Sequence, residues 1–153
     1  MNSNEVLADF QILGTRVSKL VLDTRIIEKG RADVSFDFDY EIGEVGEEGN
    51  RFRGILKFMI KAKAKVKNKI LFKIELETEG LFAGNSEKLS REKFIEMLEI
   101  NGLITLLHIS RAYLISVTAQ SGIRPPLQIP MVNVLKLRKK KAELSSNDNQ
   151  SEK

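Results

Sequence analysis

Residues 33–42 read DVSFDFDYEI, so that polar and apolar residues alternate at every step. A similar alternation returns in residues 52–67, FRGILKFMIKAKAKVK, and in residues 72–82, FKIELETEGLF. A period of two places successive side chains on opposite faces of an extended chain, which is typical of a half-buried strand. Turn residues separate the three stretches, namely Gly43, Gly46, Gly49 and Asn50 after the first and Asn68 after the second. The sequence therefore predicts three consecutive strands in an antiparallel meander.

The polar faces of these predicted strands differ in charge. The first is acidic, the second is basic and the third is acidic again, through Asp33, Asp37, Asp39 and Glu41, then Lys61, Lys63, Lys65 and Lys67, then Glu75, Glu77 and Glu79. If the lysine-rich strand lies between the other two, opposite charges face each other, and each cross-strand pair contributes about 0.2–1 kcal/mol. We therefore expect this strand order, and we interpret the lysine run as part of the sheet rather than as a phosphate-binding stripe.

The preceding segment, Phe10 to Leu22, is apolar but less regular, with Gly14 at a position suited to a β-bulge, and is a candidate fourth strand. Beyond residue 85 the apolar period becomes helical. A short helix is predicted over Arg91 to Ile100, with Ser90 as its N-cap and a stop at Asn101-Gly102. The fold class that follows is α+β, a four-stranded antiparallel sheet packed with a long helix, short helical segments and a C-terminal helix or tail.

The long helix is predicted over Leu103 to Gln120, and its apolar residues cover more than one face. A helix that is apolar nearly all round is expected to be buried on several sides, and one sheet covers only one of them. We therefore predict a homo-oligomer in which this helix meets a partner subunit, with Leu107, Leu114 and Ile115 as candidate interface residues.

Gly122 is expected to end the long helix, and Pro125, Pro126 and Pro130 prevent its continuation through the following loop. The segment from Met131 to Leu144 is compatible with a helix or with a strand followed by a tail. The last residues, Glu143 to Lys153, are small, polar and charged, and are predicted to be disordered. The domain is therefore expected to span residues 1–142, followed by a tail over residues 143–153.

The composition argues against an enzyme. The 153 residues include no cysteine and a single histidine, His108, so neither a thiolate or histidine metal site nor a Ser/His triad is expected. The glycines form neither of the phosphate-binding loops of nucleotide-binding proteins. No cofactor and no metal are predicted. The first ten residues do not resemble a signal peptide, and we expect no apolar run to approach the length of a membrane span. The expected location is the cytoplasm, without membrane insertion.

The net charge of +4 is the difference between 25 basic and 21 acidic residues. Much of it comes from a basic segment formed by Lys136, Arg138, Lys139, Lys140 and Lys141. One alternative function is therefore a weak nucleic-acid binder that uses this segment. Because such attraction is non-specific and sensitive to salt, no specific nucleic acid is predicted as a partner.

Three stretches of the sequence resemble the SecB export chaperones. They are Glu79-Gly80-Leu81-Phe82, Ser121-Gly122-Ile123-Arg124-Pro125-Pro126-Leu127, and Ile129-Pro130-Met131-Val132-Asn133. They correspond to the end of the fourth strand, the proline loop and the entry to the last helix in that family. The resemblance can be followed from about Phe10 to Leu137.

The resemblance implies an ATP-independent holding chaperone that binds unfolded polypeptides and assembles as a dimer of dimers through the long helix. Clients would lie along apolar grooves beside the second strand and under the last helix. Those positions correspond here to Val34, Phe36, Phe38, Leu135 and Leu137. Phe36 and Phe38 are equally compatible with ordinary core packing. A second alternative is an adaptor subunit of the same fold that does not hold clients.

The sequence also departs from the family. The family's phenylalanine-proline-tyrosine is His108-Ile109-Ser110 here, and its loop aromatic is Arg124. The family's docking positions for the SecA motor correspond to Lys19, Asp23, Lys73 and Glu75, so that only Asp23 and Glu75 keep the acidic character. This favours a dedicated client, such as the antitoxin of a toxin–antitoxin pair, over SecA-dependent protein transport.

Overall fold

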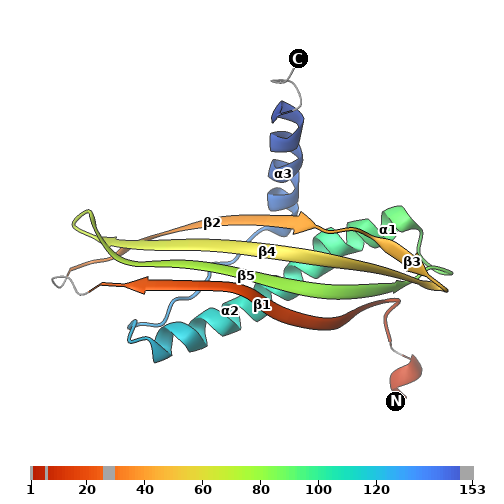
Figure 1. Ribbon diagram of the computed structural model, residues 1–153, viewed down its shortest axis with the longest axis horizontal. Coiled ribbons are helices and arrows are strands. Elements are labelled where there is room, and N and C mark those ends of the chain that lie inside the picture. The colour runs from red at the N-terminus through yellow and green to blue at the C-terminus, as the bar shows by residue number, and fades with distance from the viewer. Residues whose placement is uncertain (1, 6, 26–29, 149–153) are drawn as a thin grey trace.

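The computed structural model describes residues 2–5, 7–25 and 30–148, and its centre is one antiparallel sheet (Figure 1). Its strands are β1 (Phe10–Thr24), β2 (Asp33–Ile42), β3 (Gly46–Glu48), β4 (Arg51–Val66) and β5 (Lys69–Asn85). The order across the sheet is β1-β5-β4-β2, and the short β3 pairs with β4 beyond the end of β2. The α+β class is confirmed, and β3 is a short additional strand that the alternation did not predict.

The register of the sheet confirms the predicted strand order and places opposite charges across from each other at part of the lysine-rich strand. Asp37 of β2 lies opposite Lys61 of β4, which in turn lies opposite Glu75 of β5. Glu41, Lys57 and Glu79 form a second row of the same kind. The hairpin turn between β4 and β5 uses positive φ angles at Lys67 and Asn68, as a two-residue hairpin turn requires. Lys61 thus lies between two carboxylates on the charged face of the sheet, whereas Lys63 lies between Ser35 and Lys73.

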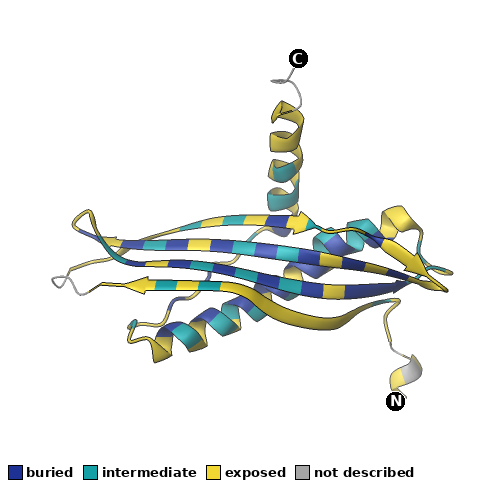
Figure 2. Ribbon diagram, in the orientation of Figure 1, coloured by how far each residue is buried: buried dark blue, intermediate teal, exposed yellow. Residues whose placement is uncertain are grey.

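Strand β1 forms one edge of the sheet and is irregular. Its register against β5 shifts between Ile12 and Gly14, which confirms the predicted bulge, and shifts again between Val17 and Lys19. Figure 2 shows β1 almost entirely exposed, whereas β4 and β5 alternate between buried and exposed residues. The edge strand therefore contributes little to the core of the single chain.

The helical layer runs as one body across a single face of the sheet, behind it in Figure 1. It consists of α1 (Arg91–Met97), a turn of π-helix η2 (Leu98–Gly102) and α2 (Leu103–Gln120). The predicted stop at Asn101-Gly102 is therefore wrong. Gly102 has helical φ and ψ angles and is buried, and a Cβ atom there would come within 3.0 Å of the Leu56 side chain. The glycine lets the helix approach the sheet closely instead of ending it.

The continuous helix Arg91–Gln120 contains an apolar window long enough to cross a membrane by length and composition, with a mean hydropathy of 1.3. The expectation that no segment approaches this length is therefore wrong. The apolar residues of one side of α2 nevertheless have partners within the chain. The core between the helices and the sheet includes Leu56, Phe58, Ile60, Leu76, Phe82, Phe94, Leu98, Leu103, Leu106 and Leu114.

The chain ends in helix α3 (Val134–Asp148), which projects away from the sheet on the β2 side (Figure 1). The amide of Lys136 donates a hydrogen bond to the side-chain oxygen of Asn133 at 3.0 Å, a typical N-cap. Of the two structures that the sequence allowed for the segment from Met131 to Leu144, a helix or a strand followed by a tail, the helix is therefore the one that forms. It also shows that residues 143–148 are helical, so the prediction of a disordered tail is wrong there, whereas residues 149–153 lie outside the described residues.

Candidate binding groove

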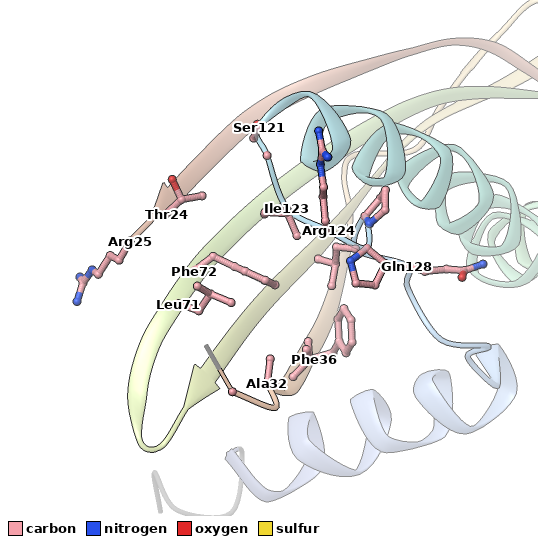
Figure 3. Close-up of a pocket in the computed structure, with 16 residues that line it drawn as sticks. Thr24, Arg25, Ala32, Phe36, Leu71, Phe72, Ser121, Ile123, Arg124 and Gln128 are labelled. Atoms are coloured by element: carbon pink, nitrogen blue, oxygen red, sulfur yellow. The ribbon is translucent and has the colours of Figure 1, made fainter. Parts of the chain in front are cut away.

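A groove of about 790 Å³ opens at the end of the sheet, between the strands and the loop that follows α2 (Figure 3). Strands β1, β2 and β5 form its floor and sides, and residues 121–128 form its wall. Most of the lining is apolar. The described lining residues are Thr24, Arg25, Gly30, Ala32, Val34, Phe36, Leu71, Phe72, Ser121, Gly122, Ile123, Arg124, Pro125, Pro126, Leu127 and Gln128.

Strand β2 supplies two of the predicted client-binding residues to this groove. Val34 is 43% exposed and Phe36 is half-buried, and both line the cavity. Their partners across the sheet are Ala64 and Ala62. Because alanine side chains are small, they fill little of the space between the helix-facing side of the sheet and the loop, and a cavity remains there. The apolar alternation of β2 thus continues past the region that α2 covers.

The aromatic rings of β2 connect the groove to the core. Phe36 stacks on Phe38 with ring centroids 6.0 Å apart, and Phe38 stacks on the buried Phe58 at 6.2 Å. Phe36 therefore belongs to both the groove and the hydrophobic layer. Phe38 does not line the groove and acts as a support beneath Phe36.

The wall of the groove begins where α2 ends. Gly122 has a φ of +81°, and the amide of Ile123 donates to the carbonyl oxygen of Thr118 at 3.1 Å, as in a Schellman motif. The hydroxyl of Thr118 is fully buried, donates to the carbonyl of Leu114, and accepts the amide of Leu127 at 2.9 Å. The predicted helix end at Gly122 is confirmed, and the same motif fixes the start of the loop.

The far end of the loop is held by a guanidinium. Arg111 of α2 donates from Nε to the carbonyl of Ile129 and from Nη2 to the carbonyl of Pro130, each at 3.1 Å. Its Nη1 lies 3.1 Å from Nδ1 of His108, which is exposed on the outer side of the helix. Leu127 and Ile129 are buried and anchor the wall to the core, while Arg124 is exposed.

The loop residues of the groove were not predicted as a binding site, although the family resemblance had drawn attention to this segment. The segment contains Ile123, Pro125, Pro126 and Leu127, and this apolar, proline-containing composition is the sequence feature that points to an ordered apolar loop. The position of these loop residues over the sheet depends on hydrogen bonds with Thr118 and Arg111, which sequence patterns do not reveal.

The predicted site residues of the C-terminal helix lie elsewhere. Leu135 is 61% exposed and borders a second cavity, of about 610 Å³, in the corner between α3 and the sheet. Leu137 is half-buried and packs against the hydrophobic core. The five predicted residues therefore do not form one site, because α3 projects outward instead of covering the groove at the end of β2.

A hydrogen-bonded cluster fixes the base of α3. The hydroxyl of Tyr40 donates to Glu99 Oε2 at 2.9 Å, and Arg138 Nε lies 3.4 Å from the same oxygen. Lys141 Nζ lies 2.7 Å from Asp39 Oδ1. Burial, reinforced by the hydrogen bond and the negative charge of Glu99, raises the pKa of Tyr40 well above its usual range. Two cations of the basic segment are thus engaged in holding the helix.

The two carboxylates predicted to dock a SecA-type partner are paired on the open face of the sheet. Glu75 Oε1 lies 3.0 Å from Lys19 Nζ, and Asp23 Oδ2 lies 3.4 Å from Arg25 Nη2. Asp23 also lies opposite Lys73 in the register of β1 and β5. The carboxylates are therefore balanced by neighbouring cations.

Two of the three residues proposed for the oligomer interface are buried within the chain itself. Leu107 and Leu114 face the sheet and belong to the core. They were assigned wrongly because one sheet covers more of α2 than the helical pattern suggested. Ile115 is 36% exposed, and it shares the outer side of α2 with the exposed Ile104, His108 and Ala112. Within residues 2–5, 7–25 and 30–148, moreover, no three His, Cys, Asp or Glu side chains gather in a way that could hold a metal ion.

The architecture defines a class of protein: one antiparallel sheet with a long helix on one face, a projecting C-terminal helix and an apolar groove under the loop between these helices. The fold matches that of a SecB-like chaperone of Mycobacterium tuberculosis, solved in complex with a ChAD peptide from the HigA1 antitoxin, with a TM-score of 0.61. The two are 16% identical over 82% of this chain and 91% of that one. The fold is therefore SecB-like.

A second solved structure, a protein of unknown function from Streptococcus agalactiae, matches with a TM-score of 0.50. It is 15% identical and the match covers 80% of this chain and 97% of that one. No protein-family model matches the sequence, and no curated protein matches it at the level of sequence. The likeness is therefore one of fold.

Proposed function

We propose that this chain is a chaperone that binds apolar segments of unfolded polypeptides in the groove at the end of the sheet and keeps them unfolded without a nucleotide. The observation that carries the proposal is the groove itself, an open apolar cavity of about 790 Å³ that includes the exposed Val34. The complex of the M. tuberculosis SecB-like chaperone with an antitoxin peptide supports the proposal.

The physical basis is simple. Burying one client side chain of the size of leucine or phenylalanine contributes about 1.5–3 kcal/mol. Ordering the client and the groove side chains offsets much of this gain. Individual contacts are therefore weak and exchange readily, and holding depends on several contacts along the client.

For the partner, we favour a dedicated client such as an antitoxin over delivery to a SecA-type motor. The pairing of Asp23 with Arg25 and of Glu75 with Lys19 leaves no unbalanced acidic surface at the positions expected to dock the motor. We further propose that the protein acts in the cytoplasm as a homo-oligomer, with a dimer of dimers as the expected assembly, and that it is not an enzyme. Because Arg138 and Lys141 hold α3, the basic segment is poorly suited to nucleic acid.

The proposal is tested by suppression of aggregation of an unfolded model protein. Val34→Ser removes an apolar contact from the groove, and Val21→Ser makes the same change on the other face of the sheet, where Val21 is 44% exposed. Because both residues are similarly exposed, both variants are expected to keep their thermal stability.

We expect Val34→Ser to hold clients less well and Val21→Ser to hold them as the parent does. If the parent protein fails to suppress aggregation at all, the alternative of an adaptor subunit without client holding is favoured. Equal loss in both variants would place the holding surface outside the groove.

A further inference from the structure

The charged side chains that line the groove are of one sign. Among the described residues that line it, only Arg25 and Arg124 are charged. Exposed charges of both signs flank the lining residues in the sequence, the basic ones being Arg31, Lys67 and Lys69 and the acidic ones Asp23 and Asp33. The groove thus combines a mostly apolar lining with two arginines and no acidic lining residue among the described ones.

The two arginines come from different elements and lie at the rim rather than on the floor. Arg25 follows β1, and its amide donates to the carbonyl of Leu71 at 2.8 Å, which fixes its backbone to β5. Its guanidinium points outward and lies 3.4 Å from Asp23 (Figure 3). Arg124 belongs to the wall, and its guanidinium also points away from the apolar floor (Figure 3).

Arg124 is exposed and makes no hydrogen bond or ion pair with the rest of the described chain. A guanidinium presents several donors in a plane and pairs with carboxylates in a bidentate manner. On the wall of an apolar groove it is positioned to contact residues that flank a bound apolar segment. Charges at the rim of an interface chiefly raise the association rate and set the choice of partner.

We propose, on the basis of the function proposed above, that the groove selects client segments in which a short apolar stretch is flanked by aspartate or glutamate. Arg124 is the main specificity residue, and Arg25 contributes less because Asp23 already lies 3.4 Å from its guanidinium. The apolar residues of the client occupy the floor near Val34 and Phe36, and its carboxylates meet the guanidiniums. Clients with basic flanks are disfavoured because like charges then face each other.

The test uses the full chain and three fluorescein-labelled peptides with the same centre of leucine, valine and phenylalanine. The residues on both sides of this centre are glutamate, glutamine or lysine. Exposed ion pairs are modest, so we expect each flanking glutamate that reaches a guanidinium to strengthen binding about two- to fivefold over glutamine at low ionic strength. The advantage should shrink as salt is added, because screening weakens exposed charge pairs. Lysine flanks should bind least well.

Three variants show which residue causes the preference for the glutamate peptide. Arg124→Gln should remove most of the preference for glutamate without changing the affinity for the glutamine peptide. Arg91→Gln, an exposed arginine at the start of α1 away from the groove, should leave the preference intact. Val34→Ser should weaken all three peptides alike. This last variant reports on the groove itself and not on its charge.

The outcomes separate the inference from the function on which it rests. If the peptides bind and Val34→Ser weakens them but glutamate gives no advantage, the charge inference is wrong and the proposed function stands. If the preference persists unchanged in Arg124→Gln, or falls equally in Arg91→Gln, it arises from the overall positive charge and the inference is overturned. If no peptide binds, the proposed function is contradicted, and so is the inference that rests on it.

Discussion

At the scale of single residues, the groove depends on a few polar groups that face the interior. Thr118 and Arg111 do not line the cavity, yet they bond to both ends of the loop that forms its wall. Val34 and Phe36 were identified from the strand pattern and the family resemblance, because strand alternation gives the side chains of one face directly. The loop residues were not, because their position is set by contacts distant in sequence.

Replacing Thr118 by valine tests how the wall is held. The change keeps the shape of the side chain but leaves the buried amide of Leu127 without its acceptor at 2.9 Å. An unsatisfied buried group of this kind costs about 1–3 kcal/mol. Chemical denaturation should show this loss, and peptide affinity should fall because the loop loosens.

Thr105→Val is the matched control, since within the described part of the chain the Thr105 hydroxyl donates to the carbonyl of Asn101, one turn earlier in the helix, and to no loop residue. It should leave both stability and binding close to those of the parent. Equal effects of the two changes would mean that the threonine–loop bond does not hold the wall.

The phenol of Tyr40 provides a prediction about pH. Its pKa is raised by burial and by Glu99, so the protonated form is favoured in the folded state. The corresponding stabilisation is complete below the pKa of an unfolded tyrosine, about 10, and is lost as pH rises above that value. In the variant Tyr113→Phe, where Tyr40 is the only remaining tyrosine, phenolate absorbance should not appear near pH 10 while circular dichroism still reports a folded chain. A titration near 10 in the folded chain would contradict the described cluster.

At the scale of elements, strands were predicted better than helix ends and helix placement. Alternation gives a strand its two faces, and the complementary charges of β2, β4 and β5 fix their order. The stop at Asn101-Gly102 was wrong because Gly102 serves close packing against Leu56. Leu135 and Leu137 were grouped with the strand residues because the resemblance places the last helix near the groove, whereas α3 here projects outward.

The base of α3 is predicted to depend on its two ion pairs. The double change Arg138→Met and Lys141→Met removes the contacts with Glu99 and Asp39. Because these pairs are partly exposed, global stability should fall by no more than about 1 kcal/mol for each pair. Hydrogen exchange over residues 134–148 should nevertheless speed up markedly, since few other contacts hold the helix.

The control for this experiment is Lys139→Met with Lys140→Met, which changes two exposed lysines of the same helix. It removes the same amount of charge without touching Glu99 or Asp39. If the two double variants exchange alike, the ion pairs do not hold α3.

At the scale of the whole molecule, the outer side of α2 leaves Ile104 and Ile115 exposed next to Ala112. We expect this side to meet another copy of the chain. Light scattering at micromolar concentration should show an oligomer, and the double change Ile104→Lys and Ile115→Lys should lower its mass. Ile55→Lys on the opposite face of the sheet, where Ile55 is 46% exposed, should not. A parent protein that is monomeric under these conditions would exclude this assembly.

The central claim is that unfolded polypeptide binds in the groove, and site-specific photo-crosslinking measures this directly. A photoreactive side chain is placed at position 34 in the groove or at the equally exposed position 21 on the other face, and the protein is irradiated with an unfolded client. The account predicts abundant client adducts from position 34, reduced by an excess of unlabelled apolar peptide, and few adducts from position 21. Adducts that are equally abundant at the two positions, or that form only at position 21, would contradict it.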